Sequence, residues 1–307
     1  MTAQKLLIAM FCVVAATGQV AAAAARLADA ATRVSGACQT ARPSVLGPML
    51  RVATLNVAHG RDDGRNQMLQ KGSTIENNLS EVAALLEMVE ADVVALQEAD
   101  GPSRWSGRFD HVEYLTRASG HACFVHGYHA ESWLYRFGTA LASDVMLSNP
   151  VVHSFAPTPP TTRKGFVLAT IRWRPRHDPR EDGPAPISVR LVSVHLDFSR
   201  AKVRDAQIAE MVARLSGDSQ YTSPLIVMGD FNADWFAKRS SVRQLAEQLD
   251  LRVFEALDEN SATYRGNTRL DWILLSRSLD FARHQVVQDV VSDHRMVVAD
   301  VVLAGGG

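Results

Sequence analysis

The chain has 307 residues, of which 47% are hydrophobic and 21% are charged, and its formal net charge is −1. These values exclude a disordered chain and allow a large core, in one large domain or two ordinary ones. The near-neutral charge gives no overall basic footprint for nucleic acid, although a local basic patch or bound cations could still serve a nuclease.

The first 25 residues have the organisation of a secretory signal peptide. Lys5 precedes an apolar run at residues 6–14, and small residues at 21–25 supply a cleavage site. An N-terminal membrane anchor is the alternative, but the apolar run is short for a span and ends in alanines and Arg26. We therefore expect residues 1–25 to be removed, leaving no transmembrane span in a secreted or periplasmic protein.

Removal of the signal peptide would leave two of the three cysteines, Cys38 and Cys123. In an oxidising compartment this pair permits one disulfide, and two unrelated buried thiols are an equal alternative. Residues 26–48 are rich in alanine and then carry two prolines, so we expect a linker there. One domain is expected at residues 49–304.

The domain opens with a strand–helix–strand pattern. Residues 49–57 predict a strand with Asn56 near its end, and residues 92–96 predict a buried strand with Glu98 just beyond it. Between them, apolar residues recur at helical spacing over residues 73–89, and the first residue and the glutamate three positions later form a capping box. Polar groups thus follow both strands.

The rest of the chain alternates less regularly. Residues 101–138 are rich in loop-forming residues and are expected to be mainly loops, while Arg163 and Lys164 could touch a phosphate but are expected to be a solvated charge pair. A layered α/β sandwich fits this order of elements. Strands are expected at residues 140–152 and 166–173, in a second sheet, and at 187–196, 225–228, 269–275 and 296–303, with helices at 200–215 and 242–249.

Residues 225–234 are the most informative stretch. Four apolar residues predict a buried strand, Gly229 ends it, and Asp230, Asn232 and Asp234 follow. Ligands gather beyond the carboxyl ends of strands in open α/β sheets, and side chains two residues apart in extended chain point to the same side. A carboxylate and an amide there could orient a water and accept its proton. A turn rich in Asp and Asn is the alternative.

Polar residues recur at the ends of the predicted strands. Carboxylate and amide oxygens suit Mg²⁺, Mn²⁺ or Ca²⁺ rather than zinc, and histidines suit acid–base chemistry near neutral pH. The sequence has no zinc-ligand spacing, nucleophile elbow or phosphate-binding glycine loop. Each polar residue has an ordinary structural explanation, but their joint recurrence favours one site. The set is Asn56, Glu98, His195, Asp230, Asn232, Asp271, Asp293 and His294.

The segments around these residues resemble the endonuclease/exonuclease/phosphatase superfamily, in a secreted bacterial-type form. The resemblance covers about residues 50–303 and implies a fold like that of deoxyribonuclease I. This is a four-layered α/β sandwich, in which two packed, mainly antiparallel β-sheets are flanked by helices. The matching segments are residues 54–60, 94–98, 193–196, 228–232, 269–274 and 292–294.

The resemblance also implies a metal and a water-handling group. Glu98 would be the principal metal ligand, with Asn56 and Asp293 close by. The metal would be Mg²⁺, with Mn²⁺ or Ca²⁺ as alternatives. Asp230 and Asn232 would position or deprotonate the attacking water.

The two histidines are implied to act on the phosphate. His294, oriented by Asp271, would contact the scissile phosphate and transfer protons. His195 would stabilise the phosphate or protonate the leaving oxygen. Family members often carry a basic residue in a central stretch that here aligns with residues 138–144 or 145–149, and it is missing in both, so no substrate-binding residue is assigned.

The expected function is that of a monomeric, divalent-metal-dependent phosphoesterase that hydrolyses a phosphodiester by in-line attack of water, as a nuclease does. Sphingomyelinase-like activity, inositol-phosphate phosphatase activity and a degenerate member that binds without catalysis are the alternatives. The substrate would be a nucleic acid, a phospholipid or a small phosphate ester. The intact set of eight residues favours catalysis over the degenerate alternative.

Overall fold

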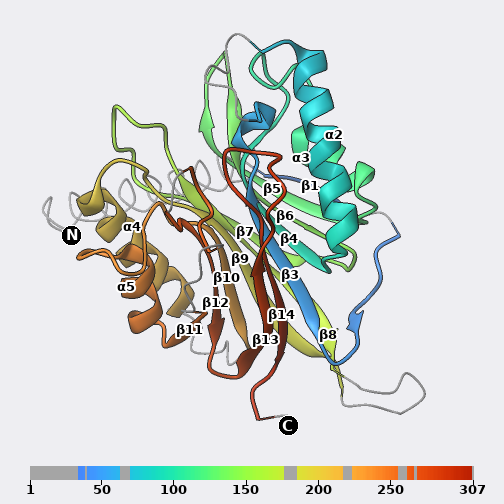
Figure 1. The fold of residues 1–307 in the computed structure, drawn as a ribbon, viewed down its shortest axis with the longest axis vertical. Coiled ribbons are helices and arrows are strands. Elements are labelled where there is room, and N and C mark those ends of the chain that lie inside the picture. Colours follow the sequence, from blue (N-terminus) through green and yellow to red (C-terminus); the bar gives the residue numbers. More distant parts are fainter. Residues whose placement is uncertain are drawn as a thin grey trace, which may run out of the picture.

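The computed structural model describes residues 34–38, 40–62, 70–175, 185–216, 223–254, 261–265 and 268–305. Two seven-stranded β-sheets pack face to face, and helices cover both outer faces (Figure 1). The fold is thus the expected four-layered α/β sandwich. The expected signal peptide lies outside the described residues, and none of the helices within them is long and apolar enough to cross a membrane.

The first sheet has the strand order β1-β5-β6-β4-β3-β14-β13, and its β3–β4 pair is the parallel one. Helices α2 (Gly72–Val89) and α3 (His111–Ala118) pack on its outer face, where Leu79 and Leu115 are fully buried. The strands are β1 (Val34–Cys38), β3 (Leu50–Asn56), β4 (Val93–Asp100), β5 (Cys123–Glu131), β6 (Arg136–Ser143), β13 (Leu279–Val286) and β14 (Val297–Leu303).

The second sheet has the order β11-β12-β10-β9-β8-β2, and β7 also pairs with β8. Helices α4 (Ala201–Ser216) and α5 (Ser241–Gln248) cover its outer face through residues such as Met211 and Leu245. The strands are β2 (Val45–Leu46), β7 (Ser148–Ser154), β8 (Gly165–Arg174), β9 (Ile187–His195), β10 (Leu225–Asp230), β11 (Leu251–Val253) and β12 (Asp271–Ser276).

The core between the sheets explains why the central strands read as nearly continuous apolar runs. These strands are buried on both faces, by the other sheet and by helices. Leu50 from the first sheet and Trp173 and Met228 from the second are fully buried in this inter-sheet core. Burial of each such side chain contributes about 1.5–3 kcal/mol, so the two sheets are held firmly together.

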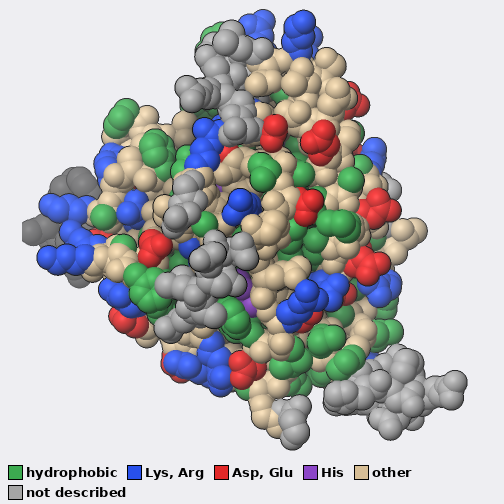
Figure 2. Space-filling view, viewed as in Figure 1, with side chains coloured by type: hydrophobic (Ala, Val, Ile, Leu, Met, Phe, Trp, Pro, Cys, Tyr) green, Lys and Arg blue, Asp and Glu red, His purple; other side chains and the backbone are tan. Residues whose placement is uncertain are grey.

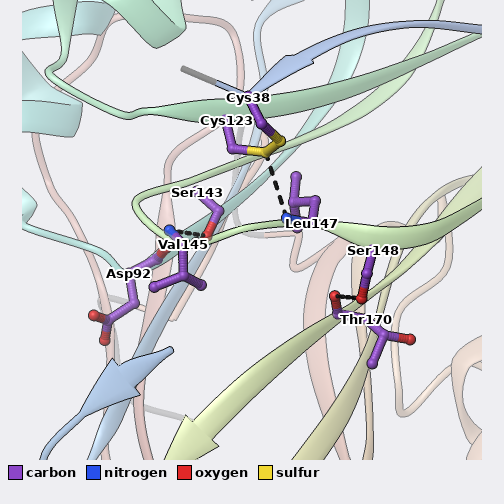
Figure 3. The surroundings of a disulfide bond; sticks show 8 residues. All are labelled: Cys38, Asp92, Cys123, Ser143, Val145, Leu147, Ser148 and Thr170. Carbon is purple, nitrogen blue, oxygen red and sulfur yellow. Dashed lines mark hydrogen bonds between the residues drawn. A yellow bond between two sulfur atoms is a disulfide. The ribbon is translucent and has the colours of Figure 1, made fainter. Parts of the chain in front are cut away.

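The N-terminal part of the fold differs from the expected linker. β1 and β2 both lie within residues 26–48, and β1 pairs with β5. Cys38 stands opposite Cys123 in this pairing, and the two form a disulfide (Figure 3). β1 has few apolar residues because it is held through its backbone. A Cβ at Gly36 would lie 2.8 Å from the Phe124 carbonyl oxygen, which is why a glycine fits there.

Three local expectations were wrong. Residues 101–138, expected to be mainly loops, contain α3, β5 and the start of β6. The polar residues of this segment are not those of a loop, because histidines such as His126 in β5 are buried, and the His126 Nε2 donates to the Ala99 carbonyl oxygen of β4. The expected capping box does not form, since α2 begins after Lys71 without a side-chain cap. The single strand expected at residues 140–152 is two strands, because the chain crosses from the first sheet to the second between β6 and β7.

The surface is mixed in charge. On the face shown in Figure 2, basic and acidic side chains are interspersed among hydrophobic and uncharged ones. This distribution agrees with the formal net charge of −1. It gives no preference for a polyanionic partner on the part of that face that the structure describes.

Candidate active site

The ends of strands from both sheets meet at one edge of the sandwich. β3 and β4 are parallel neighbours in the first sheet, and β9 and β10 are parallel neighbours in the second. Their polar end residues therefore converge, and the Asn56 Nδ2 donates across the gap between the sheets to the Asp230 Oδ2 at 3.0 Å. Direct contacts or a shared arginine link all eight residues predicted from the sequence.

The last residues of β10 approach β9 so closely that a glycine is needed there. Gly229 has φ 146°, and a Cβ there would lie 2.0 Å from the Val194 carbonyl oxygen of the neighbouring strand. Beyond it, the Asp230 Oδ1 accepts from the Asn232 backbone N–H at 2.9 Å, and the Asn232 Nδ2 donates to the Leu196 carbonyl at 3.1 Å. Asp230 therefore takes part in both a turn and the polar site. Its Oδ1 accepts the hydrogen bond within the turn, and its Oδ2 faces the site.

The Asp230 Oδ2 is the centre of the polar cluster. Besides Asn56, it faces the His195 Nε2 at 3.3 Å and the His294 Nε2 at 3.9 Å. Burial raises the pKa of Asp230 to about 7. The charge of His294 opposes this rise, and the neighbouring carboxylate of Asp271 adds to it. Such a carboxylate is suited to accept a proton from water near neutral pH.

A second carboxylate holds His294. The His294 Nδ1 lies 2.8 Å from the Asp271 Oδ2, and the Thr263 hydroxyl accepts from the Asp271 backbone N–H at 3.1 Å where β12 begins. Burial opposes the charged imidazolium, but the charges of Asp271 and Asp230 outweigh it and raise the pKa of His294 to about 10. His294 is therefore a cationic hydrogen-bond donor at neutral pH.

Glu98 is turned into the site by an irregularity in β4. The pairing of β4 with β6 shifts between Gln97 and Ala99, and Glu98 has φ 49°. Burial would raise the pKa of Glu98, but the nearby charges of His59 and Lys164 outweigh it and hold that pKa far below the ordinary value. Glu98 therefore remains an anion despite its burial.

Lys164 corrects one expectation from the sequence. Instead of being solvated, it is 5% exposed, with its Nζ 3.5 Å from the Glu98 Oε1 and 3.3 Å from the His195 Nδ1. The antiparallel register of β8 and β9 places Gly165 opposite His195, so the residue before Gly165 reaches the polar edge of the sandwich. This pairing between distant segments could not be read from the local sequence.

A second histidine–carboxylate pair was also missed. The His59 Nδ1 lies 2.7 Å from the Asp100 Oδ1, and its Nε2 lies 3.3 Å from the Glu98 Oε2. Burial opposes the charged form of His59, but Asp100 and Glu98 outweigh it and raise its pKa. A usable signal was present, because His59 follows Asn56 by three residues and Asp100 follows Glu98 by two.

Residues 53–294 match the model of the Endonuclease/Exonuclease/phosphatase family. The chain belongs to this family. Members of the endonuclease/exonuclease/phosphatase family are generally phosphoesterases, and divalent metals typically assist them. A search of curated proteins finds no match.

Solved structures share the fold at low sequence identity. A family member from Leptotrichia buccalis is 17% identical, with a TM-score of 0.60, over 82% of this chain and 99% of that one. The human Nocturnin catalytic domain with bound sulfate is 18% identical, with a TM-score of 0.55, over 88% and 98%. A mannosyl-6-phosphatase from Bacteroides thetaiotaomicron is 15% identical, with a TM-score of 0.57, over 83% and 100%.

Two groups of side chains could supply metal ligands in a member of this family. In the first, one atom each from Asp230, Asp271 and His294 lie within 4.8 Å of one another. The His294 Nδ1 is engaged by Asp271, and the ring is charged at neutral pH, so this histidine is poorly suited to bind a metal. This group is better suited to acid–base chemistry.

The second group contains Glu98, Asn56 and Asp293, and it fits a hard divalent cation. Arg61 reaches two of them, with its Nη1 3.9 Å from the Glu98 Oε2 and its Nη2 3.0 Å from the Asp293 Oδ2. Two carboxylates therefore face one cationic group here. Asn56 ends β3, which lies between β4 and β14 in the sheet, and its side-chain Oδ1 accepts from the Ala58 backbone N–H at 3.0 Å. Oxygen donors of this kind are those that Mg²⁺ and Mn²⁺ prefer.

Proposed function

We propose that the protein is a divalent-metal-dependent phosphoesterase that hydrolyses a phosphodiester by in-line attack of water. The observation that carries the proposal is the position of the Asp230 Oδ2, which lies among an amide and two imidazoles. A basic carboxylate with cationic and neutral donors around it is the set of groups that phosphoester hydrolysis requires.

Asp230 serves as the base in this proposal. Its Oδ2 would accept a proton from the attacking water, while its Oδ1 is held by the Asn232 backbone N–H. The hydrogen bond from Asn56 orients the reactive oxygen. The raised pKa of Asp230, about 7, matches the proton affinity that a base needs near neutral pH.

The two histidines stabilise the charge that develops on the phosphate. His294, kept cationic by Asp271, donates to a phosphoryl oxygen and can release its proton there. His195 contributes a second donor from the opposite side of Asp230. Burial and the charge of Lys164 hold the pKa of His195 well below its ordinary value, which favours hydrogen bonding over proton release.

Glu98, Asn56 and Asp293 would hold the metal. When bound, a divalent cation would neutralise charge on the phosphoryl oxygens. Glu98 is suited to this role because neighbouring positive charges keep it ionised. Arg61 would have to yield part of its contact with the two carboxylates.

We also propose that the protein acts outside the cytoplasm, after removal of residues 1–25. The Cys38–Cys123 disulfide supports this location, because such bonds persist mainly in oxidising compartments. Mass spectrometry of protein recovered from the periplasm or medium tests it. A mature chain starting close to residue 26 is expected, whereas an uncleaved chain retained in the cytoplasm would contradict the proposal.

The enzymatic proposal is tested with bis-p-nitrophenyl phosphate in the presence of Mg²⁺ or Mn²⁺. EDTA should abolish turnover, and His294→Ala should lower kcat by ~10²–10⁴-fold, the usual contribution of an acid–base group. Glu98→Gln should abolish metal-dependent turnover, whereas Glu87→Gln, at an exposed position on α2, should not. Turnover that survives both EDTA and His294→Ala would contradict the proposal.

The substrate class needs a parallel assay. Plasmid DNA, RNA, sphingomyelin and inositol phosphates should be offered to one enzyme preparation, with and without metal. Hydrolysis of a nucleic acid would support a nuclease. Preferred hydrolysis of sphingomyelin would contradict the nuclease assignment and indicate a lipase-like activity. Release of inorganic phosphate from inositol phosphates would contradict it and indicate a phosphatase.

A further inference from the structure

Lys164 is a buried ammonium group between two residues of the site. It lies directly before β8, its Nζ is 5.9 Å from the centre of the Phe137 ring, and it contacts both Glu98 and His195. Removing a lysine from water is costly unless the charge is paired. The contact with the Glu98 carboxylate meets this need and holds the ammonium group beside the imidazole.

The contact with His195 restricts where the ring can carry its proton. A lysine ammonium group has three N–H donors and no acceptor. The His195 Nδ1, 3.3 Å from the Lys164 Nζ, must therefore be the acceptor. The remaining ring proton then sits on Nε2, which faces a carboxylate acceptor, the Asp230 Oδ2, at 3.3 Å. Both contacts select the same neutral tautomer.

His294 is held in the opposite way. Its Nδ1 lies 2.8 Å from a carboxylate oxygen of Asp271, so that nitrogen is a donor. The two histidines on either side of Asp230 thus have partners of opposite charge, a carboxylate for one and an ammonium group for the other. As a result, the His294 ring is cationic and the His195 ring is neutral.

We propose that Lys164 is a positioning residue that fixes His195 as the neutral Nε2–H tautomer, so that this ring donates a hydrogen bond toward Asp230 and the phosphate. The inference rests on the proposed function for the use that the site makes of this donor. His195 is then a fixed donor, and the proton for the leaving oxygen comes from another group.

The tautomer can be observed directly by NMR. Protein labelled with ¹⁵N at its ten histidines is measured near neutral pH without substrate, both metal-free and with Mg²⁺, and a His195→Gln variant identifies the resonances. We expect Nδ1 of His195 to have the shift of an unprotonated ring nitrogen and Nε2 that of a protonated one. In Lys164→Met, the two nitrogens should move toward a mixture of tautomers.

Two further variants separate positioning from a structural role. Lys202→Met, at an exposed position on α4, removes the same charge and should leave both the spectrum and turnover unchanged. Lys164→Met should lower kcat by ~10–100-fold, as for other residues that orient a catalytic group. Lys164→Arg, which keeps a cationic donor, should recover the tautomer and part of kcat.

A protonated Nδ1 in the unmodified protein would overturn the inference, even if Lys164→Met fails to fold. An unchanged His195 tautomer in folded Lys164→Met would overturn it as well. Because the spectra are recorded without substrate, they do not depend on turnover. A protein with the expected tautomer and no activity on any phosphate ester would contradict the proposed function and leave the hydrogen-bond assignment intact.

Discussion

Asp271→Asn removes one negative charge from the pair that holds His294 and keeps the shape of the side chain. The amide oxygen can still accept from the His294 Nδ1, which lies 2.8 Å from the Asp271 Oδ2 in the native pair. The substitution therefore tests the charge of Asp271 with little change in packing. We expect the pKa of His294 to fall toward its ordinary value and kcat to fall by ~10²–10⁴-fold.

The contribution of this ion pair to stability can be worked out from the raised pKa of His294. A rise from 6.5 to about 10 favours the charged form in the folded protein. At about 1.4 kcal/mol per pKa unit, this rise corresponds to a free energy on the order of 5 kcal/mol that favours the charged form of His294 in the folded protein. Asp271 and Asp230 share this contribution. Because the folded-state pKa is raised, this stabilisation is fully present below pH 6.5 and is lost as the pH rises through about 10.

Two measurements on metal-free protein check this reasoning. NMR titration should place protonation of His294 near pH 10 in the unmodified protein and well below that in Asp271→Asn. The free energy of unfolding should decline between pH 6.5 and 10 in the unmodified protein, and this decline should be much smaller in the variant. Asp250→Asn, at a largely exposed carboxylate, is the matched control and should behave as the unmodified protein. A His294 titration near pH 6.5 in the unmodified protein would refute the argument.

Two further predictions concern the metal and the disulfide. Arg61→Met should lower the Kd for Mn²⁺ measured by calorimetry, because it removes the cation that contacts Glu98 and Asp293; weaker binding would contradict the assignment of these carboxylates as ligands. Replacing Cys38 and Cys123 by serine should lower the free energy of unfolding by ~4–5 kcal/mol, because the bond closes a loop with a sequence separation of 85 residues; an unchanged free energy in urea titrations would show that the bond adds no stability.

The sequence predicted the residues that follow strands and failed for those that depend on pairing between distant segments. Asp230 was found because a buried apolar run, a glycine and a polar turn are adjacent in the chain. Lys164 was missed because its place depends on the register that sets Gly165 opposite His195. A charged residue beside a turn looks solvated until the neighbouring strand is known.

The same distinction applies to the fold. The central strands were predicted because burial on both faces leaves a continuous apolar run. β1 was missed because it is held by backbone pairing and a disulfide and carries few apolar side chains. β13 was missed because it has mostly partly exposed or exposed positions at the edge of its sheet. β5 was missed because its polar residues, including His126 and His129, are buried with hydrogen-bond partners.

The proposed active site lies where the two sheets meet, and none of the strands that the structure describes belongs to both sheets. Asn56 and Glu98 belong to one sheet, and His195 and Asp230 belong to the other. The Gln97 Nε2 donates to the Ser193 hydroxyl across the same gap at 3.1 Å. The side chains packed between the sheets therefore set the distance between Asp230, the proposed base, and Asn56, which donates to it from the other sheet. A displacement of a catalytic group by about 1 Å can lower the rate by ~10²-fold. We therefore expect a change in the thickness of the hydrophobic core to alter turnover in the proposed enzyme.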